Sequence, residues 1–143
     1  MAVTRPRISV AMCTYNGAHF LAPQLESFVV QSRLPDELVV CDDGSSDDTV
    51  AILQAFARRA PFRVRIEVND VTLRSTKNFE KAIGLCTGDL IATSDQDDVW
   101  LPEKLALCEA AFARDPHIGL VFSDAEIVEE HELPVQRRLD VRL

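Results

Sequence analysis

The hydrophobic positions of this chain follow two different periods that alternate along the sequence. Short continuous apolar runs, which are typical of buried strands, are separated by longer stretches in which apolar residues recur every three or four positions, as on one face of a helix. The runs that predict strands are residues 8–13, 37–41, 62–68, 89–93 and 117–128. The stretches that predict helices are residues 19–31, 45–59, 75–85 and 102–114.

Residues that favour the first turn of a helix indicate where some of these helices begin. Ser46 and Asp47 are candidate caps of the second helix, and Ser75 or Thr76 could cap the third, because their side-chain oxygens can accept hydrogen bonds from the free N–H groups of a first turn. Pro102 is placed to open the fourth helix, since a first turn does not need the N–H group that proline lacks.

This alternation of strands and helices predicts the fold class. Right-handed crossovers between successive strands give a mainly parallel sheet with helices on both faces. We therefore expect an α/β protein, a three-layer α/β/α sandwich, in which residues 1–143 form a single domain. After residue 128 the composition turns polar, so residues 129–143 are expected to be a frayed tail or a strand that needs a partner. An open edge of the sheet could also pair with a second copy of the chain.

Composition and charge narrow the classes of function. The chain has 143 residues, of which 47% are hydrophobic, and a chain of this length can bury a real core. Its formal charge of −8 argues against nucleic acid as a partner, because an acidic surface repels phosphate groups. No apolar run approaches the length of a membrane span. We expect this segment to be soluble and cytoplasmic, although it could belong to a longer chain at the inner face of the membrane.

Polar segments follow three of the predicted strands at the point where each strand ends. They are residues 14–17 (TYNG), 42–47 (DDGSSD) and 94–98 (SDQDD). In an open parallel sheet, ligands bind outside the carboxyl ends of the strands, near the point where the strand order reverses. The three segments are therefore expected to meet at one edge of the sheet and to form a binding site there.

The acidic residues Asp95, Asp97 and Asp98 crowd like charges into one turn. Their carboxylates are hard oxygen ligands that suit Mg²⁺ or Mn²⁺, and such an ion could bridge them to a diphosphate. The alternative interpretation is an acidic turn that caps the helix beginning at Pro102, and from these residues alone the two interpretations have similar weight.

The segment of residues 42–45 also has two interpretations. It could be a turn in which Gly44 takes a positive φ and Ser45 or Ser46 caps a helix, and the sequence alone favours this. It could also present a carboxylate to a base or a ribose. Tyr15, which follows the first strand, could stack on a base or pack under a loop.

Glycine-rich phosphate loops are absent from the sequence. Neither GxGxxG nor GxxxxGK[ST] occurs, which disfavours a dinucleotide-dependent oxidoreductase. The segment CTYNGAHF also lacks the glycine-rich basic loop expected of a nucleotidyltransferase. A phosphate would have to be held by helix N-termini or by a metal ion.

Three segments together carry a resemblance to a known family. They are ISVAMCTYNGAHFLAPQLESFVVQS, LVVCDDGSSDDT and KNFEKAIGLCTGDLIATSDQDDVWLPEKL. In this order and at these spacings they resemble the N-terminal half of inverting family-2 glycosyltransferases with the GT-A fold, from about residue 8 to about residue 128. The segments KNFEKAI and QDDVWLPEKL look most like the rhamnosyltransferase-type members that build bacterial surface polysaccharides.

The resemblance implies a nucleotide site. Thr14, Tyr15 and Asn16 fall where the family lines the nucleotide pocket, with the tyrosine against the base. Asp43 falls where the family hydrogen-bonds the uracil or thymine, so the implied donor is a UDP- or dTDP-sugar. Asp95 falls on the first acid of the DxD motif, near the ribose or the metal.

The resemblance also implies a metal site and contacts to the sugar. Asp95 and Asp97 would hold a divalent ion, Mg²⁺ or Mn²⁺, at the diphosphate. Asp98 would orient the sugar or the metal shell. Lys77, together with Asn78, lies in a segment that faces the nucleotide in many members.

The implied reaction is a single displacement in which an acceptor hydroxyl attacks the anomeric carbon and the nucleoside diphosphate leaves from the opposite face. The family's general base and acceptor site lie in a second half that this sequence does not match, and no residue is assigned as the base. Asp124 is expected near the edge of the sheet that carries the site, but it lies outside the matched motifs. The chain is therefore expected to be a truncated donor-binding part. The alternative is a non-catalytic nucleotide-binding fragment that assembles with another chain.

Overall fold

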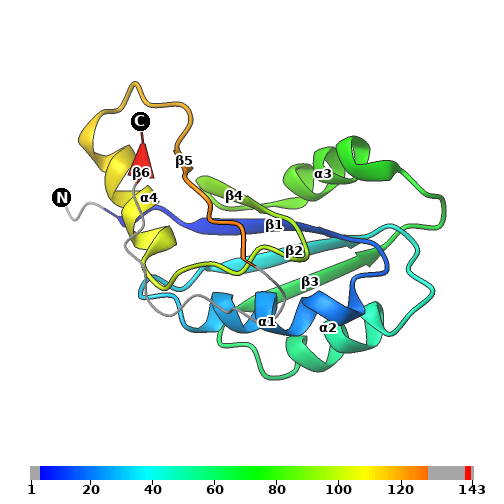
Figure 1. Ribbon diagram of the computed structural model, residues 1–143. Helices are drawn as coiled ribbons and strands as arrows, with labels where there is room; N and C mark the ends of the chain where they lie inside the picture. The colour runs from blue at the N-terminus through cyan, green and yellow to red at the C-terminus, as the bar shows by residue number, and fades with distance from the viewer. Residues whose placement is uncertain (1–3, 129–140, 143) are drawn as a thin grey trace.

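The computed structural model describes residues 4–128 and 141–142 of the chain. Strands and helices alternate over most of this length (Figure 1). The elements are β1 (Ile8–Thr14), α1 (Ala18–Val29), β2 (Glu37–Asp42), α2 (Thr49–Ala57), β3 (Arg63–Val68), α3 (Arg74–Leu85), β4 (Leu90–Ser94), α4 (Lys104–Arg114), β5 (Phe122–Ser123) and β6 (Val141–Arg142).

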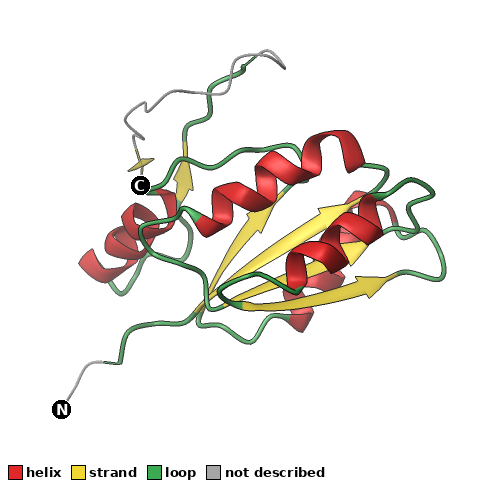
Figure 2. Cartoon of the chain, turned by 90° about the horizontal axis from the view of Figure 1, so that it is seen from below, coloured by secondary structure: helices red, strands yellow, loops and turns green. Residues whose placement is uncertain are grey.

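The main sheet has four parallel strands in the order β3-β2-β1-β4, and their arrows point the same way in Figure 2. The predicted α/β class with a mainly parallel sheet is thus confirmed. β1 is central: Cys13 lies opposite Cys41 of β2, and Met12 lies opposite Ser94 of β4. The chain moves outward from β1 to β3 and then returns to the other side of β1, so the strand order reverses between β1 and β4. Such a reversal is where ligands bind in open α/β sheets.

Helices cover both faces of the sheet, as predicted. α1 and α2 pack on one face and α3 on the other (Figure 1). The first face holds the larger apolar core, in which Val10, Met12, Leu25 and Phe28 are among the fully buried side chains. Beneath α3 the sheet presents small side chains, which let that helix lie close to the strands. These are Ala11, Cys13 and Cys41, in contact with Ala82 of α3.

The predicted fifth strand over residues 117–128 is wrong in both extent and place. Only Phe122–Ser123 forms a strand, and it pairs antiparallel with β6 in a separate two-stranded sheet. The apolar side chains of this segment lack a covering layer, since Leu120 is 76% and Ile127 is 99% exposed. Within residues 129–143, where the sequence predicts a frayed or partner-dependent tail, the structure describes only β6.

Two helix starts differ from those predicted. α2 begins at Thr49 rather than at residue 45, because the backbone N–H of Ser45 bonds to the side chain of Asp42 instead of entering the helix. α4 begins at Lys104 after a turn closed by its bond to Leu101, rather than at residue 102. None of the helices in the described residues is both long enough and apolar enough to cross a bilayer.

Two glycines near β4 give a test of this packing. A Cβ atom on Gly88 would lie 2.8 Å from the backbone nitrogen of Ser9 and 2.9 Å from the carbonyl oxygen of Arg7, neither of which can move without disturbing β1. We expect Gly88→Ala to destabilise the fold by about 1–3 kcal/mol, the usual cost of forcing atoms into a packed region. Gly84 lies in α3 with nothing within 4 Å of its Cβ position, so Gly84→Ala should stabilise the fold by about 0.5–1 kcal/mol. Urea denaturation measures both changes, and equal stability of the two variants would contradict this description of the sheet.

Candidate functional site

Side-chain hydrogen bonds join the loops that follow β1, β2 and β4. The Thr14 hydroxyl at the end of β1 donates to Asp42 Oδ2 of β2 at 2.8 Å. The backbone N–H of Asn16 donates to Ser45 Oγ at 2.8 Å, and that of Tyr15 donates to Gln96 Oε1 beyond β4 at 2.9 Å. The three polar segments that the sequence places after these strands therefore do meet at one edge of the sheet.

Asp42 organises the loop after β2, a role that the sequence analysis missed. Its side chain is fully buried and accepts hydrogen bonds from the N–H groups of Gly44 and Ser45 and from the hydroxyls of Ser45 and Thr14. Gly44 has a φ of +83°, a conformation that glycine adopts without strain. The turn interpretation of residues 42–45 is confirmed for the positive φ of Gly44, and Asp42 is the residue that closes the turn. Its second part is wrong, because the N-cap residue of α2 is Asp48 and neither Ser45 nor Ser46 caps that helix.

Asp43, the residue predicted to read the base, caps α3 in this structure. It is 5% exposed and accepts the backbone N–H groups of Leu73 at 2.7 Å and Arg74 at 2.8 Å, together with the side-chain amide of Asn69 at 2.9 Å. Burial by itself would raise the pKa of Asp43, but these hydrogen bonds outweigh it and hold the pKa below its usual value. Asp43 is therefore a charged acceptor at neutral pH. The predicted caps of α3, Ser75 and Thr76, are wrong, because a carboxylate from another loop takes that place.

Asn16 also holds loops together. Its φ is +45°, and its side-chain oxygen accepts the backbone N–H of Ser46 at 2.8 Å. Asp47 then bonds to both helices: Oδ2 accepts the first N–H of α1, from Ala18, and Oδ1 accepts the N–H and hydroxyl of Thr49 at the start of α2. The first N–H group of each of these two helices is thus satisfied by Asp47.

Gln96 clamps the backbone of Tyr15. Its Oε1 accepts the Tyr15 N–H at 2.9 Å and its Nε2 donates to the Tyr15 carbonyl at 3.2 Å. Gly17 lies so close that a Cβ atom there would come within 2.2 Å of Gln96 Oε1. The Tyr15 side chain is 55% exposed, so its ring is available to a ligand rather than packed under a loop. The sequence analysis assigned no role to Gln96, the middle residue of Asp95–Asp97.

Asp95, Asp97 and Asp98 are exposed. Among residues 4–128, no group donates a hydrogen bond to the carboxylate of Asp97 or Asp98. The N-cap residue of α4 is Glu103, and no side chain caps that helix. The interpretation of these acids as caps of the fourth helix is therefore wrong.

The charges of this turn act on one another. Partial desolvation of its carboxyl group raises the pKa of Asp95, and the negative charges of Asp98 and Asp97 raise it further. A divalent cation would oppose all of these effects, and carboxylate oxygens are the donors that Mg²⁺ or Mn²⁺ prefers. In the described residues, however, no three His, Cys, Asp or Glu side chains lie close enough to hold a metal by themselves. The acids of the turn could therefore supply some, but not all, of the ligands of a cation.

Two glutamines, Gln24 of α1 and Gln31 shortly after that helix, bond to the two ends of the acidic turn. Gln24 donates to the Ser94 hydroxyl at 2.8 Å, before the turn, and Gln31 donates to the Leu101 carbonyl at 2.8 Å, after it. Between these two points Trp100 is buried against Phe28 in an edge-to-face contact with ring centroids 4.8 Å apart. Trp100 is thus a core residue, and the backbone of the turn is anchored at both ends.

Two cavities flank β4. The smaller, of about 340 Å³, adjoins the acidic turn, and its lining includes Asp97, Asp98, Asp124 and Glu126. Lys104 lines both cavities and donates to Ser123 Oγ at 2.8 Å.

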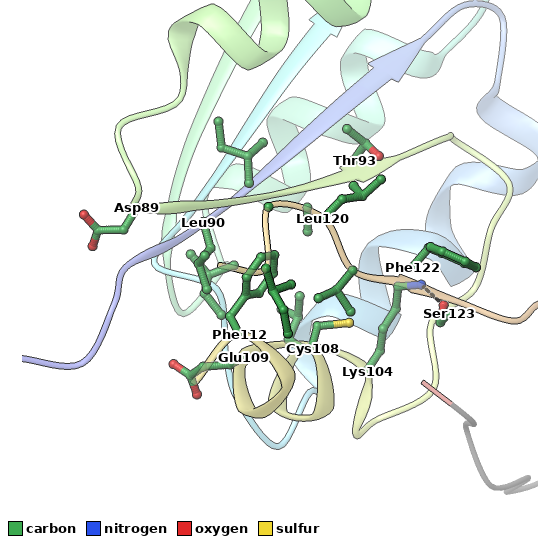
Figure 3. Close-up of a pocket in the computed structure, with 17 residues that line it drawn as sticks. Asp89, Leu90, Thr93, Lys104, Cys108, Glu109, Phe112, Leu120, Phe122 and Ser123 are labelled. Atoms are coloured by element: carbon green, nitrogen blue, oxygen red, sulfur yellow. Dashed lines mark hydrogen bonds between the residues drawn. The ribbon is translucent and has the colours of Figure 1, made fainter. Parts of the chain in front are cut away.

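The larger cavity, of about 660 Å³, lies beside the outer edge of β4 and against α4 (Figure 3). Apolar side chains such as Leu90, Phe112 and Leu120 make up much of its lining. Among the described residues β4 pairs with β1 alone, so its outer edge is open. Pairing of this edge with a second copy stays a prediction.

Lys77 and Asn78 lie apart from the acidic turn. The Lys77 side chain is 68% exposed on α3, forms an ion pair with Glu80 and lines neither cavity. Asn78 is buried and bonds to the carbonyl oxygen of Cys41 and to Asn69. The implied contact of Lys77 with the donor stays a prediction, whereas Asn78 faces the interior.

The clamp on Tyr15 can be tested by a double-mutant cycle. Gln96→Ala removes two hydrogen bonds and should destabilise the fold by about 1 kcal/mol. Gly17→Ala should displace the Gln96 side chain and so lose the same two bonds. We therefore expect Gly17→Ala to cost less stability in a Gln96→Ala background than in the native chain, as measured by urea denaturation of all four proteins. Additive effects would contradict the contact.

Comparison with known proteins identifies the family. The family model for Glycosyl transferase family 2 matches residues 9–138. A putative glycosyltransferase, EpsE of Bacillus subtilis, is 31% identical over 125 residues, which are 87% of this chain and 45% of that protein. Chondroitin synthase of Escherichia coli is 34% identical over 119 residues, which are 82% of this chain and 17% of that protein. The chain thus spans less than half the length of either relative.

Solved structures with a similar fold include a mannosyltransferase and a protein in complex with UDP. The mannosyltransferase PcManGT of Pyrobaculum calidifontis, in complex with GDP-Man and Mn²⁺, has a TM-score of 0.73 and 25% identity, covering 87% of this chain and 37% of that one. Residues 1–349 of TarS of S. aureus, in complex with UDP, also give a TM-score of 0.73, at 23% identity, covering 90% of this chain and 38% of that one. With the predicted fold present and its family model matched over most of the sequence, the chain belongs to glycosyl transferase family 2.

Proposed function

We propose that this chain binds a nucleoside-diphospho-sugar at the carboxyl ends of β1, β2 and β4, for transfer of the sugar to an acceptor hydroxyl with inversion. The observation that carries the proposal is the convergence of three kinds of group at the reversal of strand order. Tyr15 offers an exposed ring, Asp43 a charged acceptor, and Asp95 and Asp97 a pair of carboxylates. A base, a ribose and a metal-bound diphosphate need groups of these three kinds.

The base would lie between Tyr15 and Asp43. A carboxylate only accepts hydrogen bonds, so it selects bases that present an N–H group, such as uracil and thymine at N3 or guanine at N1. An exposed tyrosine ring adds a surface on which any base can stack. We favour a UDP- or dTDP-sugar, and the relative WfgD of Escherichia coli is named for the use of UDP-Glc. Thr14 and Asn16 would support this pocket through their bonds to Asp42 and Ser46.

The diphosphate would be held by a divalent ion, Mg²⁺ or Mn²⁺, bound to Asp95 and Asp97. When bound, such an ion stabilises the negative charge that develops on the leaving diphosphate. The chain's own part is to keep the two acids in place, which the contacts of Gln24 with Ser94 and of Gln31 with Leu101 support. Since no complete ligand set exists in the described residues, the ion should bind well only together with the nucleotide.

The sugar would extend from the diphosphate toward the smaller cavity, where Asp98 could accept hydrogen bonds from its hydroxyl groups. No general base is assigned among the described residues. The names of chondroitin synthase and WfgD among the relatives support a role in polysaccharide synthesis, which we propose for this chain as well. Rhamnose specificity rests on the motif resemblance alone.

Calorimetric titration tests this function. UDP, dTDP and GDP would each be added to the native chain with and without Mn²⁺, and Mn²⁺ would be added alone. We expect one nucleotide to bind with Mn²⁺ present, weaker binding without it, and little binding of Mn²⁺ alone. Mn²⁺ should lower the Kd of the nucleotide by a smaller factor in Asp97→Asn than in the native chain, smaller by at least about tenfold, because one metal ligand loses its charge.

Glu80→Gln is the matched control, since it makes the same chemical change at an exposed acid that pairs with Lys77 on the same helix. This variant should bind the nucleotide as the native chain does. Failure of all three nucleotides to bind the native chain would overturn the proposal. An equal loss in both variants would show that the overall charge of the protein, and not a site at Asp97, controls binding.

A further inference from the structure

A buried chain of polar side chains runs from α3 to the carboxylate of Asp43. Asn69, which directly follows β3 and is 8% exposed, donates from Nδ2 to Asp43 Oδ1 at 2.9 Å and to Asn78 Oδ1 at 2.8 Å. Its Oδ1 accepts a hydrogen bond from Lys81 Nζ at 2.7 Å. This series of hydrogen bonds thus connects the ammonium group of Lys81 on α3, through the amide group of Asn69, to the carboxylate of Asp43 in the loop after β2.

The chemistry of these groups fixes which way each amide points. A lysine ammonium group only donates, so the oxygen of Asn69 must face Lys81 and its NH₂ group must face Asp43. Asn78 donates to the carbonyl oxygen of Cys41 at 2.8 Å, so its own oxygen faces Asn69. The Asn69 amide is therefore held by three partners, of which Lys81 is the one that donates to its oxygen.

Loss of that cation would leave the Asn69 oxygen without its donor in a buried place. A full flip of the amide is opposed, because its NH₂ group faces two acceptors, Asp43 Oδ1 and Asn78 Oδ1. The Asn69 side chain would instead shift toward another donor, and the Asp43 carboxylate would lose part of the support that Asn69 gives it. Lys81 is partly buried, so its charge is screened less by water than that of an exposed lysine.

The same contacts leave the two oxygens of Asp43 unequal. Oδ1 accepts two hydrogen bonds, from Asn69 and from the backbone N–H of Leu73, whereas Oδ2 accepts one, from the N–H of Arg74. Arg74 has a φ of +65°, which is uncommon for a residue with a side chain and is held here by its surroundings. Oδ2 is thus the oxygen with more capacity for a ligand.

We propose that Lys81 is a positioning residue that acts through Asn69 to hold the Asp43 carboxylate in the orientation that recognises the N–H group of a base. The inference rests on the proposed function, in which Asp43 reads the base of the nucleotide. It assigns base selectivity to a lysine that does not itself touch the nucleotide.

α3 offers a matched control for this role. Lys77 lies one helical turn before Lys81 on the same helix, but its ammonium group pairs with Glu80 at the surface and reaches no part of the buried chain. Lys77→Met and Lys81→Met make the same change in charge and size. A difference between them reports the contact with Asn69 rather than the loss of a positive charge from α3.

The test compares binding of UDP with binding of N3-methyl-UDP, which lacks the N–H group, by calorimetry in the presence of Mn²⁺. The native chain and Lys77→Met should both prefer UDP with similar ratios of the two Kd values, because any contact of Lys77 with the donor would act on UDP and N3-methyl-UDP alike. In Lys81→Met this ratio should fall by about tenfold, because the hydrogen bond from the base N–H group to the charged Asp43 carboxylate no longer contributes to the binding of UDP. Lys81→Arg, which keeps the charged donor, should restore most of the ratio. If GDP proves to be the nucleotide that binds, GDP and N1-methyl-GDP replace the pair.

A ratio of two Kd values is insensitive to a general loss of stability, since an unfolded fraction weakens both to the same extent. Should Lys81→Met fail to fold, Lys81→Gln, which keeps a neutral donor, serves in its place and should lower the ratio in the same direction. If the native chain binds UDP and the ratio of Lys81→Met or its substitute equals that of Lys77→Met, the positioning role is overturned and the proposed function stands. If the native chain binds neither UDP nor GDP, both are overturned.

Discussion

The pairing of β1 with a parallel strand on each side is the constraint on which the rest of the structure depends. β1 is fully buried and takes β2 and β4 as its neighbours, so three strands deliver their carboxyl ends to one place. Each strand must then leave the sheet through a loop whose backbone N–H groups need partners. The site consists of the side chains that bond to those N–H groups, together with a few acidic side chains that do not.

Acids at this edge fall into two groups with different environments. Asp42 and Asp43 are buried and accept several hydrogen bonds each, so they determine the shape of the loops. Asp97 and Asp98 are exposed and accept none from residues 4–128, and their charges raise the pKa of Asp95. A fold does not need carboxylates of the second kind. Their presence between two well-anchored points of the chain is what favours a ligand, and above all a cation, at this turn.

The sequence predicted much of the fold because that part depends on local pattern. Apolar runs and helical periodicity identified the four strands of the main sheet and the four helices, and the polar residues after three strands identified the edge that carries the site. The helix caps were predicted less well, because the group that caps α3 is Asp43, from a distant loop, and not the adjacent Ser75.

The remaining errors have the same cause. Residues 117–128 have a strand-like pattern, but the outer edge of β4 is separated from them by a cavity, and a pattern cannot show whether a neighbour is in reach. Gln96 gave one signal, its place between two acids of the motif, yet its partner Tyr15 lies 81 positions away. The contact of Lys81 with Asn69 has no signal in the sequence, since nothing in the local pattern distinguishes the role of Lys81 from that of the exposed Lys77.

The central claim is that a nucleotide and a divalent ion meet at the ends of β1 and β4. Paramagnetic broadening of amide signals by Mn²⁺, measured by NMR on the ¹⁵N-labelled chain with UDP present, tests this most directly, with dTDP or GDP in its place if calorimetry shows either to be the ligand. The account predicts that residues 95–98 lose intensity first, followed by residues 15–17 on the neighbouring loop. Broadening that appears equally at other exposed acids such as Glu80, or that is unchanged when the nucleotide is left out, would contradict it.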